Sequence, residues 1–351
     1  MFKFRKILVT FVWTRIIFCM AEENFSDIGR IGAIARLYEG TPFRPFEDTG
    51  FEASAQGVIR TRTRIFLEGI DFNLVYFPLK HLGYKMITAV TGELYAGLSR
   101  PRTLALRLGV SAKLDFAQVR ELWTGAVAAA KEHGYKAMDL DLVPSVNGLT
   151  ASVSATGETP CATDRRRPEP QSKDLLCVSG NLGGAFFGMK ILEREMRRFD
   201  EEGTHPALEK YRMMVASYLK PEITPGLPAL LEDADLLPSC GCLVTGGLAE
   251  AVKRIARTTG LGAKVYADKI PFEGNSFELG REMNIDPISA AMNGGEDYRL
   301  LFTVPILKME KFRRDFQTFD IIGHLARPDV GTVLVSPDGV EFPLKAQGWE
   351  D

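Results

Sequence analysis

The stretch that decides the fold class is residues 175–192, LLCVSGNLGGAFFGMKIL. Its first five residues form an apolar run typical of a buried strand, and the glycines that follow indicate a turn. Apolar residues then recur at the spacing of a helix. Glycines at a helix start allow backbone N–H groups to approach an anion, although tight packing requires the same residues. The stretch therefore predicts a strand, a glycine turn and a helix.

The remainder of the second half repeats this alternation. A similar unit covers residues 242–260, where Gly246 and Gly247 precede a helix with one apolar stripe. Further strands are predicted at 264–267, 299–304 and 332–335, and the last of them closes a hairpin that ends at Phe342. Strands that alternate with helices in this way indicate a mixed α/β fold.

Residues 58–67 alternate strictly between two faces and therefore predict a strand. Arg60, Arg62 and Arg64 share one face, and the other face carries Ile and Thr side chains. A basic strand face suits a phosphate or nucleotide held without a metal ion. The alternative is a solvated arginine ladder on an edge strand.

The first half also contains a helix, which Asp115 is placed to N-cap and Gly134 to end, and a strand at residues 149–155. A segment rich in Pro and Arg then separates the two halves. We expect an N-terminal extension at 1–19, an N-terminal domain at 20–157, a linker at 158–172 and a C-terminal domain at 173–351.

The composition is that of a globular protein. Of 351 residues, 45% are hydrophobic and 25% charged, which leaves ample material for a core. The net charge of -2 provides no general attraction to nucleic acid. Five cysteines are too few for a disulfide framework and are consistent with a reducing compartment. Cys240 and Cys242 resemble half of a metal site, but no second cysteine pair or nearby histidine completes it, so we expect two partly buried thiols.

The N-terminus has features of a secretory signal, because three basic residues precede the apolar run 7–18. Arg15 interrupts that run, which is also shorter than the roughly 20 residues that span a bilayer. Met20 and the polar residues after it are typical of the start of a cytoplasmic protein. We therefore expect a wrong start site, a cytoplasmic location and no membrane association, with a signal or anchor as the alternative.

The strongest local indication of a functional site is the segment Gly294-Gly295-Glu296-Asp297-Tyr298. Two glycines free the backbone, two carboxylates follow at once, and a strand begins directly after them. Such a cluster can hold a cationic ligand or a metal ion at a strand edge. The alternative is an ordinary glycine turn with solvated acids.

Short segments spread through the chain share the order and spacing of one known family. They are residues 26–29, 34–37, 67–72, 78–85, 178–183, 294–302, 322–323 and 344–349. From about Phe25 to the C-terminus, the sequence resembles the thiamine-monophosphate kinase family of the aminoimidazole-ribonucleotide synthetase superfamily.

This resemblance implies a two-domain α/β fold with an N-terminal domain that dimerises through its sheet and a C-terminal α/β domain that covers the cleft. It implies a cytoplasmic homodimer that transfers the γ-phosphoryl group of ATP to thiamine monophosphate, yielding thiamine diphosphate. ATP and Mg²⁺ are the implied cofactors, because Mg²⁺ neutralises the phosphate chain during the transfer.

The family's metal-binding acids are retained only in part. The resemblance assigns Mg²⁺ binding to Asp48, Glu93 and Asp141, with Glu47 as a further candidate. Three other acids of the family correspond to Arg64, Leu243 and Gly246. Arginine carries a permanent positive charge and cannot coordinate Mg²⁺, so the sequence predicts weakened metal binding.

The remaining site residues are likewise implied by the resemblance. Substrate binding at the thiamine end is expected from Asp71, Glu296 and Asp297, and nucleotide or phosphate binding from Gly180, Gly183, Thr245 and Arg64.

Three hypotheses follow from this pattern. In the first, the protein folds and dimerises like the family, but phosphoryl transfer is impaired or absent. In the second, it is an active kinase of that family. In the third, it is a metal-independent binder of a phosphorylated ligand, which uses Arg60, Arg62 and Arg64 with the turn at 180–184. Thiamine monophosphate and ATP are the expected small-molecule partners, and neither nucleic acid nor a membrane is expected.

Overall fold

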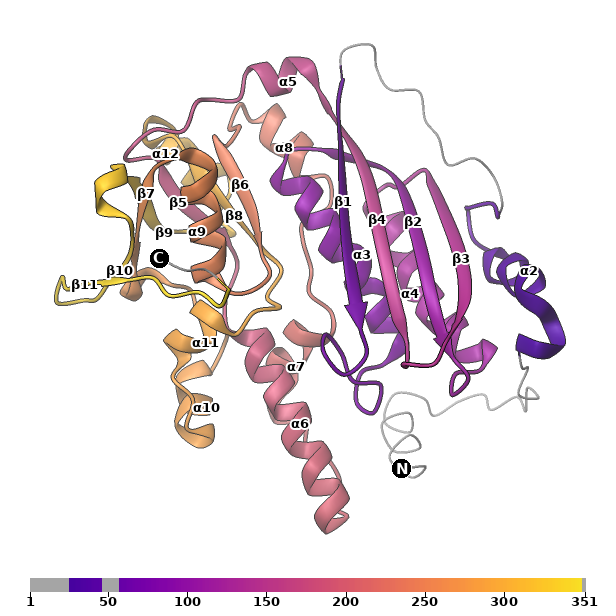
Figure 1. Ribbon diagram of the computed structural model, residues 1–351. Coiled ribbons are helices and arrows are strands. Elements are labelled where there is room, and N and C mark those ends of the chain that lie inside the picture. The colour runs from indigo at the N-terminus through magenta and orange to yellow at the C-terminus, as the bar shows by residue number, and fades with distance from the viewer. Residues whose placement is uncertain (1–24, 46–56, 349–351) are drawn as a thin grey trace.

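The computed structural model describes residues 25–45 and 57–348, which form two sheets with helices packed against them (Figure 1). Glu47 and Asp48, together with the extension at 1–19, lie outside the described residues. A four-stranded sheet lies in the first half of the chain and a seven-stranded sheet in the second half. The predicted mixed α/β class is therefore confirmed.

The N-terminal sheet has the strand order β1-β4-β2-β3, in which β4 is antiparallel to both β1 and β2, and β2 is parallel to β3. Helices α3 and α4 pack against one face of this sheet, and α2 lies beside β3 (Figure 1). The elements are α2 (Phe25–Tyr38), β1 (Gly57–Leu67), α3 (Leu79–Ala96), β2 (Arg100–Ser111), α4 (Phe116–Glu132), β3 (Ala137–Ser145), β4 (Thr150–Pro160) and α5 (Cys161–Arg165).

The predicted start and end of α4 are confirmed. The Asp115 side chain accepts a hydrogen bond from the backbone N–H of Gln118, and the Gln118 side chain accepts one from the backbone N–H of Asp115. This reciprocal pair satisfies two backbone donors that a helix N-terminus leaves unpaired. Beyond the helix end, Gly134 has a φ of 77°, which favours glycine.

The predicted linker at 158–172 begins too early. Strand β4 continues to Pro160 because its last residues pair with β1, up to the match between Pro160 and Gly57. Helix α5 follows directly. The prolines and arginines of this region indicated a linker. The last residues of β4 form a strand nevertheless, because they pair with β1, which lies far earlier in the chain.

Two glycines allow α3 and α4 to cross closely. A Cβ atom on Gly125 would lie 1.8 Å from the Lys80 carbonyl oxygen, and one on Gly83 would lie 1.9 Å from the Leu122 carbonyl oxygen. These obstructing atoms belong to the backbone, so the two helices would have to move apart to admit a methyl group. The helix pair that covers the sheet therefore depends on the two glycines.

We predict that Gly125→Ala lowers the free energy of unfolding by at least about 2–3 kcal/mol, because the added methyl group overpacks the crossing. Gly32→Ala is the matched control, since a Cβ there meets no atom within 4 Å. Alanine's higher helix propensity should leave that variant unchanged or up to about 1 kcal/mol more stable. Urea unfolding measures both, and a Gly125→Ala protein as stable as the parent would contradict the close crossing.

The C-terminal sheet has the order β11-β10-β7-β9-β5-β8-β6, with β5 near its middle. Its strands are β5 (Leu175–Ser179), β6 (Cys240–Val244), β7 (Gly262–Tyr266), β8 (Arg299–Val304), β9 (Phe319–Ala326), β10 (Thr332–Val335) and β11 (Glu341–Pro343). The helices around it are α6 (Gly184–Glu202), α7 (Arg212–Leu219), α8 (Leu227–Asp233), α9 (Leu248–Thr259), α10 (Ser276–Met283), α11 (Pro287–Asn293) and α12 (Met309–Asp315).

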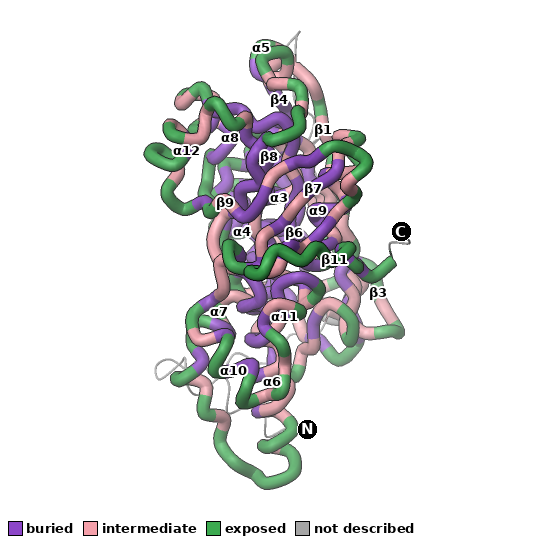
Figure 2. The backbone as a smooth tube through the Cα atoms, turned by 90° about the vertical axis from the view of Figure 1, so that its left-hand side faces the viewer, coloured by how far each residue is buried: buried purple, intermediate pink, exposed green. Residues whose placement is uncertain are grey.

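Both predicted units of strand, glycine turn and helix are confirmed, as β5 with α6 and β6 with α9. The predicted strands at 299–304 and 332–335 match β8 and β10, and the hairpin to β11 also forms. Strand β9 had no prediction of its own. Figure 2 shows the central strands of this sheet buried, whereas β11 runs along the surface.

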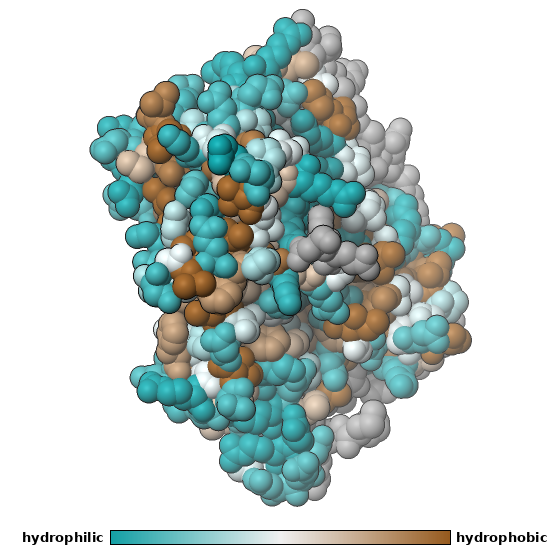
Figure 3. Space-filling view, turned by 60° about the vertical axis from the view of Figure 1, so that its left-hand side comes forward, coloured by the Kyte–Doolittle hydropathy of each residue, from teal (hydrophilic) through white to brown (hydrophobic). Residues whose placement is uncertain are grey.

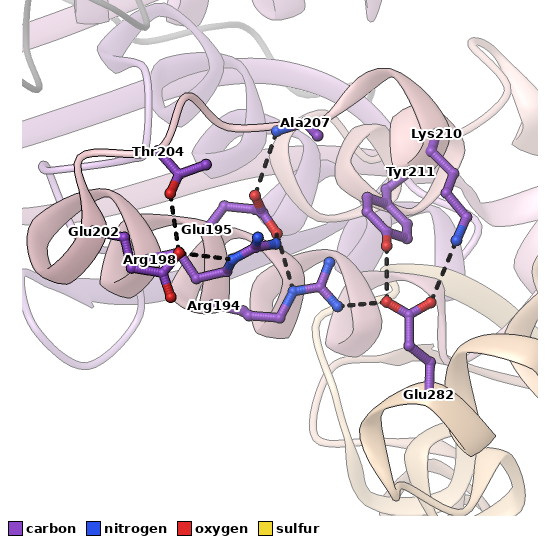
Figure 4. Close-up of polar contacts among 9 residues, drawn as sticks. All are labelled: Arg194, Glu195, Arg198, Glu202, Thr204, Ala207, Lys210, Tyr211 and Glu282. Carbon is purple, nitrogen blue, oxygen red and sulfur yellow. Dashed lines mark hydrogen bonds and ion pairs between the residues drawn. The ribbon is translucent and has the colours of Figure 1, made fainter.

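The far end of α6 forms the lowest part of the molecule in Figure 1, and Figure 3 shows hydrophilic side chains covering it. A network of hydrogen bonds and ion pairs connects α6 to α10 (Figure 4). The Glu282 carboxylate accepts hydrogen bonds from Tyr211 at 2.8 Å, from Arg194 at 2.8 Å and from Lys210 at 3.5 Å. The network therefore stabilises the packing of α6 against α10.

Within residues 25–45 and 57–348, no helix is both long enough and apolar enough to cross a bilayer. Cys161, Cys177, Cys240 and Cys242 are free thiols, and the last two are buried more completely than the partial burial expected from the sequence.

Candidate functional site

The arginine face of β1 is turned into the molecule. Arg60, Arg62 and Arg64 are half-buried, whereas Ile59 and Ile65 on the other face are 43% and 57% exposed. The predicted separation of the two strand faces is therefore confirmed. Although β1 is an edge strand, its arginines line pockets together with side chains of α3 and α9. The alternative of a solvated arginine ladder is wrong.

Arg64 and Lys85 converge on one carboxylate from the other half of the chain. Arg64 Nη2 lies 3.0 Å from Glu296 Oε1, and Lys85 Nζ lies 2.7 Å from Glu296 Oε2. Arg64 also lies 3.9 Å from Asp71 Oδ1. The structure therefore brings together three residues that the sequence predicted for the site, and adds Lys85, which it did not predict.

Aromatic rings enclose the Lys85 ammonium group, whose side chain is almost fully buried. The nitrogen lies 4.0 Å from the ring centre of Tyr218, 5.2 Å from that of Phe77 and 5.6 Å from that of Tyr298. The negative faces of aromatic rings attract a cation, and more strongly where water is excluded. The cage therefore already holds a cation that the chain itself supplies.

The charges of this cluster balance inside the protein. Burial alone would raise the pKa of Glu296, but Lys85 and Arg64 outweigh it and hold that pKa below its ordinary value. Burial lowers the pKa of Lys85, and the nearby Glu296 carboxylate opposes this effect. Glu296 is therefore an ionised carboxylate that two cations from the N-terminal half neutralise.

An unusual backbone directs Glu296 toward these cations. Glu296 and Tyr298 have φ values of 65° and 48°, which non-glycine residues adopt rarely. Their backbone N–H groups donate to the carbonyl oxygens of Thr245 at 2.8 Å and Val244 at 3.0 Å. Strained residues of this kind persist only where the surroundings fix them, often at functional sites. The glycine-rich signal thus marks a constrained loop, not a solvated turn.

Asp297 points the other way and caps helix α6. Its carboxylate accepts hydrogen bonds from the backbone N–H groups of Gly183 at 2.9 Å and Ala185 at 3.1 Å. Burial raises the pKa of Asp297 to about 6. The glycine turn predicted to receive a phosphate therefore has its helix-start amides occupied by the protein's own carboxylate. The phosphate-binding roles of Gly180 and Gly183 stay predictions.

The raised pKa of Asp297 predicts a pH effect on stability. The native state keeps this proton up to about pH 6, whereas an unfolded chain releases it near the ordinary value of 3.8. Stability from this group is therefore greatest at low pH and declines as pH rises from about 4 to 6. Relative to Asp297→Asn, the parent should lose roughly 2–3 kcal/mol across that window.

Urea unfolding between pH 4 and 7 measures this difference. Asp268→Asn serves as the control because Asp268 is exposed. A gap between the parent and Asp297→Asn that stays constant over this range would show that the native carboxyl group does not retain its proton.

The predicted metal ligands do not gather in the described part of the chain. Glu93 on α3 pairs with Arg254 at 3.3 Å on the helix side of the N-terminal sheet. Asp141 alternates with buried leucines on β3, so it lies on the opposite face, where it pairs with Arg30. Leu243 is fully buried in the core. Among residues 25–45 and 57–348, no group of three or more His, Cys, Asp or Glu side chains is arranged to hold a metal ion.

Among the described residues, cations of the chain pair with Glu93 and Asp141, so these acids do not form a free donor set for Mg²⁺, and Glu47 and Asp48 lie outside these residues. Arg254 also lies 3.6 Å from Glu250, so one guanidinium group serves two acids. The roles of Glu93 and Asp141 as ligands stay predictions.

Two pockets are lined by the arginines of β1. The first has a volume of about 420 Å³ and is lined mainly by β1, α3 and Arg254. The second has a volume of about 460 Å³ and lies between β1, the segment after α5, β6 and α9. They share Arg62, Glu93 and Arg254 as lining residues. The structure thus forms a basic cleft where the two halves meet.

Known proteins resemble this chain over most of its length. Thiamine-monophosphate kinase of Aquifex aeolicus is 22% identical over 287 residues, which cover 82% of this chain and 88% of that protein. The kinase of the same name from Pyrococcus horikoshii is 25% identical over 272 residues, covering 76% and 78%. No protein-family model matches the chain.

Solved structures share the fold. The AaThiL complex with AMPPCP and TMP has a TM-score of 0.66 at 20% identity and covers 93% of this chain and 97% of its own. HypE of E. coli, a hydrogenase maturation protein, has a TM-score of 0.65 at 16% identity and covers 90% and 96%. The fold therefore belongs to the aminoimidazole-ribonucleotide synthetase-like class, as predicted.

The proteins that resemble this chain in sequence have the same activity in their names. They are thiamine-monophosphate kinases from distant bacteria and archaea. The chain is similar to thiamine-monophosphate kinases at low identity and over most of its length, which confirms the resemblance seen in the sequence.

Proposed function

We propose that this protein is a thiamine-monophosphate-kinase-like protein in which Mg²⁺-dependent phosphoryl transfer from ATP to thiamine monophosphate is impaired or absent. The observation that carries the proposal is Arg64. It stands where the family resemblance implies a metal-binding Asp, and it is paired with Glu296 at 3.0 Å. A guanidinium group cannot coordinate a cation.

Coulomb repulsion supports the same conclusion. A cation about 4 Å from Arg64 would meet about 4 kcal/mol of repulsion per unit charge at an effective dielectric constant of about 20. Glu93, the nearby acid that the resemblance retains, is already neutralised by Arg254. Phosphoryl transfer relies on positioning and on metal ions that neutralise the phosphate oxygens, so a cleft without them lacks the main catalytic element.

The assembly is a further part of the proposal. We infer a homodimer formed through the outer face of the N-terminal sheet, whose β1 strand exposes Ile59 and Ile65. Thr61 and Thr63 lie between these two isoleucines, and exposed apolar side chains favour burial against a second copy. A monomer mass in light scattering would contradict this inference. The free cysteines support a cytoplasmic location, because thiols persist in reducing compartments.

Calorimetry with AMPPCP tests the proposed loss of metal dependence. The full chain is titrated once in Mg²⁺ and once in EDTA. We expect the same affinity, or the same lack of binding, in both solutions, because no set of three or more acids among the described residues is arranged to hold Mg²⁺. Binding that strengthens by about tenfold or more in Mg²⁺ would contradict the proposal.

A further inference from the structure

The guanidinium group of Arg64 is surrounded by aromatic rings and carboxylates. Its central carbon lies 5.3 Å from the ring centre of Phe66 and 5.3 Å from that of Tyr298. Its Nη2 atom lies 3.0 Å from Glu296 Oε1 and 3.9 Å from Asp71 Oδ1. Rings attract a flat cation through their negative faces, and carboxylates attract it through its charge and its N–H donors. The surroundings therefore have the chemistry of a binding site for a planar cation.

The groups around this guanidinium have other contacts that hold them in place. Tyr298 Oη donates to Glu296 Oε1 at 3.0 Å, and Lys85 Nζ lies 2.7 Å from the other carboxylate oxygen. The backbone N–H of Leu67 donates to Asp71 Oδ2 at 2.8 Å. We therefore expect the walls of the site to keep their positions when the arginine side chain is removed.

The charges of the site balance only while Arg64 is present. Arg64 and Lys85 are two cations that face the carboxylates of Glu296 and Asp71. Without Arg64, one cation would face two carboxylates that are largely removed from water. A desolvated charge without a partner is unfavourable, so the emptied space would favour another cation.

Arg64 is also the cation of this pair that an outside molecule can replace. Its side chain is 27% exposed, whereas that of Lys85 is 2% exposed. Arg64 lines the pocket of about 420 Å³ that β1 and α3 form with Arg254. The space that the arginine side chain fills therefore adjoins a pocket through which a small molecule can enter.

We propose that Arg64 is an internal occupant of a site for a flat organic cation, and that its side chain excludes such cations from the Glu296 end of the cleft. A guanidinium, an amidinium or a cationic aromatic heterocycle has the flat shape and the charge that the two rings and two carboxylates accept. Arg64 therefore determines which ligands this end of the cleft rejects. The inference goes beyond the proposed function and does not depend on whether phosphoryl transfer survives.

Chemical replacement of the side chain tests this inference. Arg64→Ala removes the side chain beyond Cβ, and ethylguanidinium consists of the atoms that this change removes. In calorimetry with the full chain, Arg64→Ala should bind ethylguanidinium at least about tenfold more tightly than the parent does. Ethylurea has a similar shape but no charge and should bind neither protein. Added salt should weaken the binding of ethylguanidinium, because the attraction is between charges.

Arg62→Ala is the matched control. Arg62 lies on the same face of β1 and lines the same pocket, but within the described part of the chain it donates to the Thr61 carbonyl oxygen at 3.1 Å and not to a carboxylate. This variant should bind ethylguanidinium no better than the parent. The melting temperature of each free variant reports whether it folds. If Arg64→Ala does not fold alone, refolding with each probe replaces calorimetry, and only ethylguanidinium should restore the fold.

Four results would overturn the inference. They are binding of ethylguanidinium by the parent as tight as by Arg64→Ala, an equal gain in Arg62→Ala, an equal effect of ethylurea, and no effect of ethylguanidinium on Arg64→Ala in either measurement. Thiamine diphosphate formation by the parent would refute the proposed function but leave this inference standing. Failure of ethylguanidinium to act on Arg64→Ala would refute the inference alone, so the two failures are distinguishable.

Discussion

Glu296→Gln should lower the free energy of unfolding by about 3–5 kcal/mol, because it leaves Lys85 buried without a carboxylate. Lys85 Nζ lies 2.7 Å from Glu296, and its side chain is only 2% exposed, so water cannot replace the lost partner. Arg64 loses its closest carboxylate in the same change. Urea unfolding of the purified variant measures the loss.

A second variant distinguishes the loss of the ion pair from a nonspecific effect of the substitution on stability. Lys85→Met combined with Glu296→Gln removes both charges and leaves an apolar chain inside the aromatic cage. Replacing both charges of a buried pair by neutral groups is often nearly neutral, so the double variant should recover the part of the loss that comes from Lys85, but not the part that comes from Arg64. Glu310→Gln on exposed α12 is the control and should change stability by less than about 0.5 kcal/mol. A loss below about 1 kcal/mol for Glu296→Gln would mean that the pair is not fixed as described.

Arg64→Asp should lower the free energy of unfolding by about 3 kcal/mol in EDTA, because it replaces a cation by a third carboxylate beside Glu296 and Asp71. Mg²⁺ should restore part of that stability in the variant, since a ligand that binds only the native state stabilises it. The parent should show no such response, because Arg64 already supplies the positive charge. Arg64→Lys is the control, since it keeps the charge.

Thermal unfolding in EDTA and in Mg²⁺ measures all three proteins. Equal stability of Arg64→Asp and the parent in EDTA would show that Glu296 and Asp71 do not depend on this cation.

The sequence predicted the fold well because its signals are local. The strand, turn and helix at 175–192 needs only neighbouring residues, and so does the alternation at 58–67. The Asp115 cap and the glycine behind α4 likewise act within one helix. The end of β4 was missed because it depends on pairing with β1 across a long separation in the chain.

The site was harder to predict, because its contacts join residues far apart in the sequence. The glycines before Glu296 indicated that this segment matters, but nothing in α3 marks Lys85 as its partner more than two hundred residues earlier. Arg167 looked like part of a linker. The structure places it on a pocket wall together with residues of α5, β6 and α9.

Asp141 shows a different kind of difficulty. The order Asp139-Leu140-Asp141-Leu142 places both acids on the face away from the core, and the structure has them there, paired with arginines. The family resemblance assigned Asp141 to a metal site shared with Glu93. Within one chain the sheet separates the two residues, so the strand's own alternation was the better guide to position.

The most direct measurement of the central claim is thiamine diphosphate formation from ATP and thiamine monophosphate in Mg²⁺. The full chain is compared with the Aquifex aeolicus thiamine-monophosphate kinase as the active reference. Loss of electrostatic stabilisation at one transition-state contact alone costs about 100- to 1,000-fold in rate, so turnover should be at least about 1,000-fold lower than the reference. Turnover within about tenfold of the reference would contradict the claim that arginine pairs have replaced a working metal site.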